Sequence, residues 1–439
     1  MRRRPGSDIM VDTARKFLIA GAFLMPMLTF RVAGHQTATT NTGLTLSDVC
    51  FFISAIFLGA SVRRKKIAPT PVWHLGTLFV VVGGLTASYF AISPISSITV
   101  VARMIFVLTV WQWTIRHLLS DERWLKYALT AYVFGCSASG LVAILQLKAH
   151  VLISWGGLVN GRSFGLTHHP DDTGSFLALG LVIAVGLALH LGGGRAWWRV
   201  ACIALIAIGL IFSGSVSGML CGLIGCFVLL ARRGVNVGKL IAVGVVLVGI
   251  YIGGTALQGN GTGGKSLNPI ARFQAATGPE SGGGNSVTPR IGTIKAAWDG
   301  VVASPIFGHG LDVESSLVYL DRNVDVQYPT HNLILMGWYQ GGLFFLVGEL
   351  ICIGVGLRRL MRRGVRNAYV DMIFGGAVAV LVFSMQAPTM FDRYFWFPFV
   401  LATTFPAVTR AAARVSGRTF ASPRPALTAA SAGVSGSTD

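Results

Sequence analysis

Long apolar segments, separated by shorter polar ones, run through most of the chain. An α-helix needs about 20 apolar residues to cross the hydrocarbon core of a bilayer. Segments near this length recur from the first part of the chain to the last, and each is continuously apolar. The strands of a membrane β-barrel would instead alternate between apolar and polar side chains. The pattern predicts an all-α integral membrane protein with about twelve transmembrane helices.

The predicted spans have approximate bounds. They cover about residues 17–30, 44–62, 72–92, 98–118, 127–147, 173–191, 200–231 as two spans, 240–257, 331–357, 368–387 and 394–408. Residues 200–231 are too long for one span, and a Ser/Gly-rich sequence from Ser213 to Gly218 predicts a turn in their middle. A single kinked helix is the alternative, but it would move the basic residues 358–366 to the opposite side of the membrane.

The polar segments divide the chain into three parts. Residues 1–16 are predicted to form a basic cytoplasmic tail, 17–409 the transmembrane domain, and 410–439 a disordered cytoplasmic tail rich in Ala, Ser, Gly and Pro. No cleavage site follows the basic tail, so we expect an uncleaved anchor. The largest loop covers about residues 258–330, before the third-last span, and two parts of it are rich in glycine.

Positive charge is distributed unequally across this predicted topology. A formal net charge of +19 is compatible with nucleic-acid binding when taken alone. However, 26 of the 36 Lys and Arg residues lie on one side, nine lie on the other, and Arg103 lies within a span. This distribution follows the positive-inside rule, places both termini in the cytoplasm and indicates contact with anionic membrane lipid. It argues against a nucleic-acid partner.

Neither the cysteines nor the histidines predict a metal site. All six cysteines lie in apolar segments, without the spacing of a zinc site, and are predicted to be packing residues. The sequence His168-His169-Pro170-Asp171-Asp172 combines metal-ligand types, but adjacent side chains diverge and no third ligand is specified. We expect a helix to begin there, with Asp171, Asp172 and Thr173 in its first turn. No cofactor is expected.

Residues 290–342 lead from the large loop into a span. Apolar residues recur at helical spacing after Arg290, which predicts a short helix lying on its apolar face; these residues are Ile294, Ala297, Trp298 and Val301. Ser304-Pro305 is expected to end this helix, and Gly308-His309-Gly310 to form a turn. His331-Asn332 then begins an apolar helix. A guanidinium and an imidazole therefore reach one membrane face, where they can bind an anion and handle a proton.

Several arginines lie on the predicted outer side. They are Arg162, Arg272, Arg290, Arg322 and Arg393. The planar guanidinium binds two oxygens of a phosphate at once, so arginines at the interface fit a lipid-linked phosphate or pyrophosphate. Arg162 and Arg290 are favoured because each lies in a patterned stretch rich in Gly, Ser and Thr. The alternative is that these side chains only reach to lipid headgroups.

Two ionisable residues lie within predicted spans. Arg103 is costly there, so we expect it to have a partner or to face a cavity. Glu349 is either a buried protonated carboxyl or a helix-packing contact. His331, at the start of the same span as Glu349, could act as a general base or orient an acceptor hydroxyl. The alternative for His331 is a purely local hydrogen bond.

Three motifs resemble the O-antigen ligase/polymerase family of bacterial membrane glycosyltransferases. The first is Gly161-Arg162-Ser163-Phe164-Gly165, followed by a His-Pro pair and a span. The second is Arg290 with Trp298 and Ser304-Pro305-Ile306-Phe307-Gly308-His309-Gly310. The third is His331-Asn332, followed by Gly341-Gly342. The twelve-span layout and the large loop before the third-last span resemble that family too.

The resemblance implies a metal-independent, GT-C-like glycosyltransferase fold in the bacterial inner membrane, with its active site facing the periplasm. It implies a glycan donor on undecaprenyl pyrophosphate, and lipid A core or a growing polysaccharide as the acceptor. Arg162 and Arg290 would hold the leaving pyrophosphate, while His331 would assist the acceptor hydroxyl and the anomeric carbon would invert. The further expected substrate-binding residues are Arg103, Arg272, His309 and Asn332. The family often has Ser-Arg in the turn at 213–218, where this chain has no Arg.

Three kinds of transferase fit this resemblance: a ligase onto lipid A core, a polymerase of O-antigen or exopolysaccharide repeats, and a protein O-oligosaccharyltransferase. No soluble acceptor-binding domain is visible, which disfavours the last. A transporter or flippase is the main alternative, and it would place charged residues around a cavity at the middle of the membrane. The titratable residues instead gather on one predicted face. A non-catalytic membrane scaffold is a third class.

Overall fold

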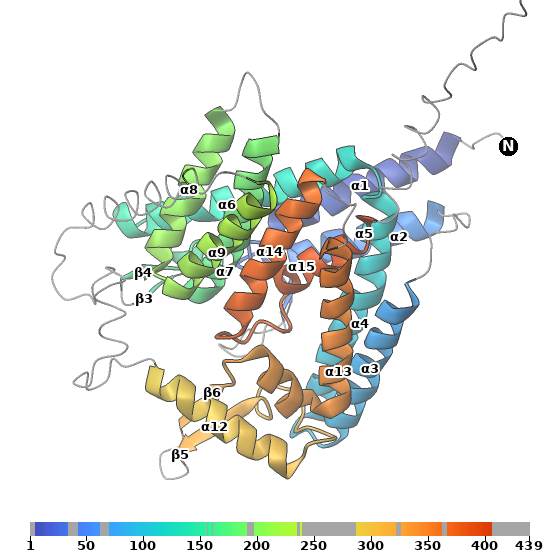
Figure 1. The fold of residues 1–439 in the computed structure, drawn as a ribbon, viewed down its shortest axis with the longest axis vertical. Coiled ribbons are helices and arrows are strands. Elements are labelled where there is room, and N and C mark those ends of the chain that lie inside the picture. Colours follow the sequence, from blue (N-terminus) through green and yellow to red (C-terminus); the bar gives the residue numbers. More distant parts are fainter. Residues whose placement is uncertain are drawn as a thin grey trace, which may run out of the picture.

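Helices dominate the computed structural model (Figure 1). It describes residues 5–33, 43–61, 70–155, 157–159, 161–190, 197–234, 238, 287–321, 326–361 and 367–405. The α-helices are α1 (Pro5–Leu24), α2 (Leu46–Ser61), α3 (Pro71–Tyr89), α4 (Pro94–Ile105), α5 (Gln112–Leu118), α6 (Glu122–Lys148), α7 (Pro170–His190), α8 (Trp197–Ser213), α9 (Val216–Arg232), α12 (Val287–Ala303), α13 (Leu333–Met361), α14 (Ala368–Ser384) and α15 (Arg393–Ala402). A π-helix, η1 (Phe106–Trp111), joins α4 to α5, and a short 3₁₀-helix, η2 (Ile153–Trp155), follows α6.

Short antiparallel strand pairs lie in the connections. β1 (Arg31–Ala33) pairs with β2 (Leu44–Thr45), and β3 (Leu158–Val159) pairs with β4 (Arg162–Ser163). The longest pair, β5 (Leu317–Asp321) and β6 (Val326–Pro329), lies in the large loop. The apolar pattern did not predict these strands, because each is too short to show an alternating repeat.

The helices have the length and composition of a membrane protein. Within the described residues, five helical segments are long and apolar enough to cross a membrane. They are α3, Pro94–Leu118, α6, α7 and α13, and the shorter apolar helices are α2, α8, α9 and α14. The chain is therefore a mostly helical membrane protein, as predicted. The span at 240–257, the glycine-rich parts of the large loop and the tail at 410–439 lie outside the described residues.

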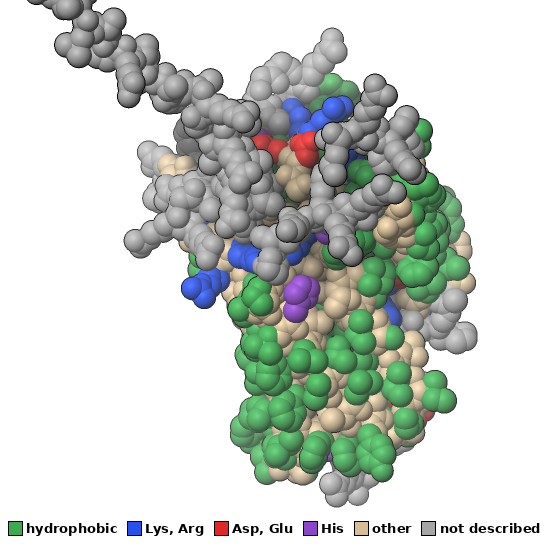
Figure 2. Space-filling model, turned by 90° about the vertical axis from the view of Figure 1, so that its right-hand side faces the viewer, with side chains coloured by type: hydrophobic (Ala, Val, Ile, Leu, Met, Phe, Trp, Pro, Cys, Tyr) green, Lys and Arg blue, Asp and Glu red, His purple; other side chains and the backbone are tan. Residues whose placement is uncertain are grey.

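Apolar side chains cover much of the face that α3 and α4 present (Figure 2). On α3 the exposed apolar residues recur every three or four positions and form one stripe, consisting of Val72, Leu75, Leu78, Val82 and Leu85. Trp73, Val80 and Ala87 lie on its buried side, where α3 packs against α13. A helix that is apolar on both its packed and its outward faces is suited to contact lipid.

α15 lies at the centre of the helical packing. All ten of its residues are buried, and it packs against α13, α14 and α5. Its side chains include three phenylalanines and a tryptophan, so its burial removes a large apolar area from the surroundings. The first residue of this buried helix is Arg393. A charged side chain is therefore carried into the interior, where it must be paired.

The Ser/Gly sequence separates two helices, as predicted. α8 ends at Ser213, and α9 begins at Val216 after a turn in which Gly214 has φ +59°. The Ser215 hydroxyl accepts a hydrogen bond from the backbone N–H of Gly218 at 3.3 Å, which caps α9. The alternative of one long kinked helix over residues 200–231 is wrong.

α13 is broken, which the sequence prediction of a continuous span missed. Gly342 has φ +73° and ψ −176°, a conformation outside the helical region that favours glycine. The backbone N–H of Leu343 bonds to the carbonyls of Pro305 and Ile306 at 3.1 and 3.2 Å. The loop after α12 therefore takes the hydrogen bonds that the helix loses at its break.

A Gly342→Ala substitution is expected to destabilise the protein. A Cβ atom at this position would lie 2.1 Å from the Ile306 carbonyl oxygen and would also have to adopt a positive φ. We expect the free energy of unfolding to fall by at least 1–3 kcal/mol, roughly the range for a strained backbone residue. The denaturation midpoint of the detergent-solubilised protein measures the effect. Gly354→Ala is the matched control in the same helix, because a Cβ there meets no atom within 4 Å.

Two predicted element boundaries need correction at the N-terminus. α1 begins at Pro5, inside the stretch predicted to be a tail, and it ends at Leu24, before the predicted end of the first span. Residues 25–30 turn away and lead into β1. The prediction placed the start of this helix too late, because hydropathy detects only the apolar part of a helix.

Candidate functional site

Charged side chains from four helices lie near one another. They come from the starts of α2, α7 and α15 and from the middle of the segment formed by α4 and η1. Three of these helices begin with an acidic or basic residue in or beside their first turn. We define the polar cluster as Asp48, Arg103, Asp171, Asp172, Asp392 and Arg393 together with Arg162.

Arg162 is fixed in place by the hairpin that carries it. Its neighbour Ser163 donates a hydrogen bond to the side-chain oxygen of Gln146 in α6 at 2.5 Å, and the N–H of Gly165 donates to the same oxygen at 2.9 Å. The Gln146 amide in turn donates to the Gly165 carbonyl at 2.9 Å. A buried glutamine thus holds the backbone on the C-terminal side of Arg162 and directs its side chain.

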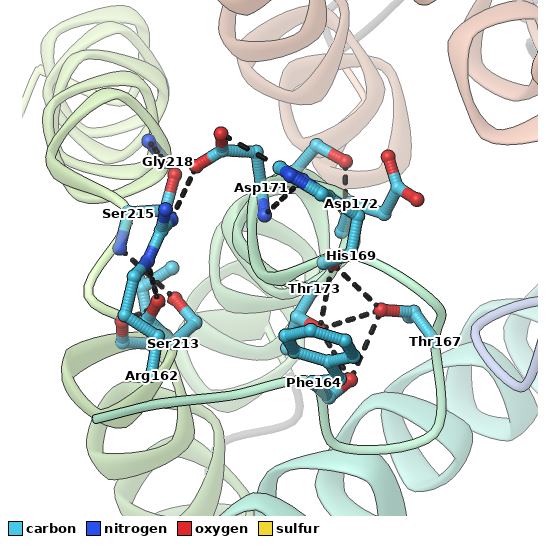
Figure 3. Close-up of polar contacts among 12 residues, drawn as sticks. Arg162, Phe164, Thr167, His169, Asp171, Asp172, Thr173, Ser213, Ser215 and Gly218 are labelled. Atoms are coloured by element: carbon cyan, nitrogen blue, oxygen red, sulfur yellow. Dashed lines mark hydrogen bonds and ion pairs between the residues drawn. The ribbon is translucent and has the colours of Figure 1, made fainter. Parts of the chain in front are cut away.

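The guanidinium of Arg162 connects three elements (Figure 3). Its Nε donates to the Ser213 carbonyl at 2.9 Å, and a terminal nitrogen lies 2.5 Å from Asp171 Oδ1. Its side chain is 15% exposed, so it remains within reach of a ligand. The turn at 213–218 has no arginine of its own, and Arg162 brings a guanidinium to it from the neighbouring hairpin.

α7 begins where the sequence predicted. Its first residue is Pro170, and Asp171 and Asp172 lie in its first turn, where carboxylates interact favourably with the helix dipole. The Thr173 hydroxyl, hydrogen-bonded to Thr167 at 2.7 Å and to the Phe164 carbonyl at 2.5 Å, ties this turn to the hairpin loop. The interpretation of this sequence as a helix start is confirmed.

The two histidines before α7 point to different partners. His168 Nε2 lies 2.7 Å from the Leu28 carbonyl, and burial lowers the pKa of His168, which favours the neutral ring. His169 Nδ1 lies 3.7 Å from Asp171. Among the described residues, no three His, Cys, Asp or Glu side chains are grouped to hold a metal ion.

Asp48 and Arg393 form a buried ion pair. Two guanidinium nitrogens of Arg393 each contact a different carboxylate oxygen of Asp48, which is the bidentate arrangement. The Thr45 backbone N–H and hydroxyl also donate to Asp48, at 2.8 and 3.1 Å. The Arg393 side chain is only 4% exposed. The charge of Arg393 is therefore neutralised by Asp48, which joins the start of α15 to the start of α2.

Arg103 has no such partner. It is half-buried in α4, three residues before the π-helix begins, and makes no hydrogen bond or ion pair to any described residue. It interacts electrostatically with Arg393, Asp48 and Asp392 across a longer distance. A π-helical turn widens the helix beside it, and such turns recur at functional sites. The sequence predicted a partner or a cavity for Arg103, and the structure shows no direct partner within the described chain.

His331 and Asn332 form the entrance to α13. His331 Nδ1 lies 2.8 Å from the Pro329 carbonyl, which can only accept, so this nitrogen carries a proton. In the neutral ring Nε2 then carries the lone pair that a base requires. Asn332 caps α13 by accepting from the Leu335 N–H at 3.0 Å, and its amide lies 3.5 Å from the Met385 carbonyl. Met385 follows α14, in the connection that leads to Asp392.

The short helix after Arg290 is confirmed as α12, but its predicted buried face is partly wrong. Ala297 and Val301 are buried against α13 and β5, together with Thr293. Ile294 and Trp298, predicted on the same face, are 42% and 51% exposed. The packed face follows small residues because the helix lies close to the broken part of α13. Ile294 is left exposed, while the half-exposed Trp298 ring packs edge-on against Trp338 of α13, with centroids 5.9 Å apart.

His309 packs against α13 and not against the polar cluster. Its Nε2 lies 2.9 Å from the Gly300 carbonyl, and its ring stacks on Tyr339 with centroids 4.5 Å apart. Gly308 and Gly310 on either side have positive φ, so the predicted turn is confirmed. Of the other predicted residues, Arg290 lies in the first turn of α12, and Arg272 and Arg322 lie outside the described residues.

The sequence did not single out the carboxylates of the polar cluster. Asp48, Asp172 and Asp392 each lie within three residues of a helix start, a position commonly explained by capping alone. Only the three-dimensional contacts show that these helix starts adjoin. The six cysteines, in contrast, are all buried and free, as predicted for packing residues.

Comparison with known proteins supports the resemblance noted in the sequence. The O-antigen ligase family model matches residues 200–350, which include α8, α9, α12 and the first part of α13. No curated protein matches the chain. The matched region contains Arg290, His309, His331 and Asn332, whereas Arg103, Arg162 and Arg393 lie outside it. This match over residues 200–350 supports the resemblance to the O-antigen ligase/polymerase family.

Proposed function

We propose that the protein transfers a glycan from undecaprenyl pyrophosphate to an acceptor at the periplasmic face of the inner membrane, as a ligase or a polymerase. The observation that carries this proposal is Arg103, a half-buried guanidinium with no hydrogen-bond or ion-pair partner in the described chain. An unpaired cation within an apolar helix is costly and is retained where it meets an anion. A pyrophosphate at the end of a polyprenyl chain supplies such an anion at this depth.

The proposed reaction assigns separate tasks to the basic residues and the imidazole. Arg103 and Arg162 hold phosphate oxygens, and Arg290 and Arg272 are assigned further phosphate contacts. The acceptor hydroxyl attacks the anomeric carbon while the bond from that carbon to the phosphate oxygen breaks, so configuration inverts. The electron pair leaves with the pyrophosphate, whose growing charge the guanidinium groups stabilise. His331 Nε2 accepts the hydroxyl proton, with Asn332 and His309 holding the surrounding backbone.

Twelve spans and a GT-C-like arrangement are part of the same proposal. The described helices support a multi-pass membrane protein, and the polar cluster lies at helix starts that the positive-inside rule places outside. A transporter would gather its charged residues around a midplane cavity between paired broken helices. In the described chain α13 is the helix with a non-helical residue in its interior, and the charges lie mainly at helix ends.

The test is the lipid-linked glycan profile of cells that lack the protein. If it is a polymerase, single repeat units accumulate on the lipid carrier. If it is a ligase, long polymers remain on the carrier and the acceptor stays bare. Arg103→Ala should reproduce the deletion phenotype at normal protein level, because a charge-assisted hydrogen bond contributes roughly 1.5–3 kcal/mol. Arg103→Lys, which keeps a point charge without the planar fork, should restore part of the activity.

Two results would contradict this proposal. Accumulation only on the inner face would favour a transporter, because the donor would then never reach the outer face. An unchanged glycan profile in the deletion strain would remove the transferase activity altogether. Glu122→Gln provides a control for expression, since Glu122 lies in the first turn of α6, away from the polar cluster.

A further inference from the structure

We infer that Asp172, Asp392 and Tyr394 form a subsite that binds the hydroxyl groups of a sugar ring, next to the cations that hold the pyrophosphate. The inference rests on the proposed function and extends it, because it names a part of the site that recognises carbohydrate and not phosphate. It concerns residues outside the matched O-antigen ligase domain.

Asp172 is the first component of this subsite. It is half-buried in the first turn of α7, and its carboxylate makes no hydrogen bond or ion pair to a described residue. Its neighbour Asp171 turns toward Arg162, whereas the Asp172 carboxylate lies on the far side of the helix start from Arg162 (Figure 3). The start of α7 thus presents the Asp171 carboxylate to Arg162 and the Asp172 carboxylate in a different direction.

Asp392 is the residue directly before α15. The carboxylates of Asp172 and Asp392 interact electrostatically. Phe176, one turn after Asp172, contacts the Tyr394 ring with centroids 4.3 Å apart. The carbonyl of Phe176 accepts a hydrogen bond from the Tyr132 hydroxyl of α6 at 3.2 Å, which helps to hold Phe176 against Tyr394. The pair of carboxylates is therefore held by rigid helices.

Tyr394 supplies an independent indication of a ligand. Its side chain is 0% exposed, and its hydroxyl forms no hydrogen bond of good geometry to any described residue. The hydroxyl lies beside Ser175 and Thr389 and within electrostatic reach of Asp392 and Asp172. A buried hydroxyl without a partner costs roughly 1–3 kcal/mol, so such groups usually meet water or a ligand.

The chemistry of these groups selects a polyhydroxylated ligand. Two neighbouring carboxylates repel each other, and hydroxyl donors between them relieve that repulsion through charge-assisted hydrogen bonds. A sugar ring offers adjacent hydroxyls that can each donate to one carboxylate, while a ring oxygen or third hydroxyl meets the phenol. A phosphate would be repelled. Arg103 interacts electrostatically with Asp392, and Arg162 contacts Asp171, the neighbour of Asp172, so the sugar would lie beside the pyrophosphate that these two arginines hold.

The test measures transfer by the full-length protein in liposomes. The donor is the lipid-linked glycan extracted from deletion cells, and the donor and acceptor concentrations are varied separately. Asp172→Asn should raise the KM for one of the two sugar substrates about tenfold or more, with kcat at saturation little changed, because one charge-assisted hydrogen bond is weakened. A raised acceptor KM assigns the subsite to the acceptor sugar, and a raised donor KM assigns it to the sugar of the donor. Asp12→Asn, at an exposed ion pair with Lys16, is the control.

Direct binding of the oligosaccharide, released from the donor by mild acid, separates this inference from the proposed function. If the wild type binds it and Asp172→Asn binds it at least fivefold more weakly, the subsite stands even where no transfer occurs. Equal binding and equal KM values in both proteins would overturn the subsite. Loss of oligosaccharide binding on addition of EDTA, restored by a divalent cation, would overturn it too, because the carboxylates would then hold a metal ion.

Discussion

Asp48→Ala is expected to lower the free energy of unfolding by about 3–5 kcal/mol. The substitution leaves the Arg393 guanidinium 4% exposed and without the carboxylate that contacts two of its nitrogens. Removing one partner of a buried ion pair costs more than the pair contributes, because the remaining charge stays out of water. The denaturation midpoint in detergent micelles and the yield of folded protein both report the loss.

The exposed pair of Lys16 and Asp12 is the matched control. Its atoms approach to 2.8 Å, but its side chains are 72% and 42% exposed. Asp12→Asn should therefore change the free energy of unfolding by no more than roughly 1 kcal/mol. The double variant Asp48→Leu and Arg393→Met should recover much of the lost stability, since an apolar pair of similar volume is often tolerated in place of a buried ion pair. Equal effects of Asp48→Ala and Asp12→Asn would contradict the role of burial.

His331→Ala is expected to reduce transfer by about 10²–10⁴-fold, the usual contribution of a positioned general base. The protein level should be unchanged, because the imidazole is partly exposed and its Nδ1 bonds locally, to the Pro329 carbonyl. The initial rate of transfer in liposomes measures this effect. Donor binding should persist, since the proposed phosphate contacts come from the arginines.

His331→Gln helps to separate catalysis from local structure. Its amide can replace the hydrogen bond to the Pro329 carbonyl but cannot accept the hydroxyl proton, so the rate should stay low. Arg290→Ala should also abolish transfer, but through weaker donor binding. Full activity of His331→Ala would refute His331 as the proton acceptor. The proposed arginine contacts would still be tested separately, by the lipid-linked glycan profile of the Arg103→Ala variant.

Burial of the Asp48–Arg393 pair also bears on the role of Arg103. The guanidinium groups of Arg103 and Arg393 interact electrostatically, and of these two only Arg393 has a direct carboxylate partner. Without Asp48, Arg393 would become a second unpaired cation and would compete with Arg103 for the proposed pyrophosphate. The Asp48–Arg393 ion pair thus leaves Arg103 of α4 as the unpaired cation of these two. This gives a functional reason for retaining a buried ion pair that by itself adds little net stability.

Several features of the fold could be predicted from local sequence. Apolar segments near the length of a span predicted the helices, and the Ser/Gly sequence predicted the separation of α8 from α9. The start of α7 and the turn around His309 were also predicted, because capping residues and glycines act within a few residues of where they stand. The bounds of α1 were wrong, since a helix can continue beyond its apolar part.

The break in α13 required the tertiary structure. Two adjacent glycines permit a break but do not require one, and a helical glycine is common in membrane helices. The break occurs because the loop after α12 supplies two carbonyls, those of Pro305 and Ile306, for the Leu343 N–H. That loop is far from Leu343 in the sequence, so the local pattern around the glycines does not reveal the contact. The exposed face of α12 was mispredicted for a related reason. Close approach to α13 selects small residues, whereas the apolar pattern alone favours the large ones.

By itself, the sequence determined that this protein is helical, lies in a membrane, resembles the O-antigen ligases and carries basic residues at one predicted face. These properties depend on composition, on spacing and on short motifs, which are local. Only the tertiary structure decided that Arg393 is paired with Asp48, 345 residues away, and that Arg103 is not paired. Whether a charge is neutralised depends on which side chains lie within a few ångströms of it. Packing of distant helices sets those distances, so a pattern along one chain does not contain them.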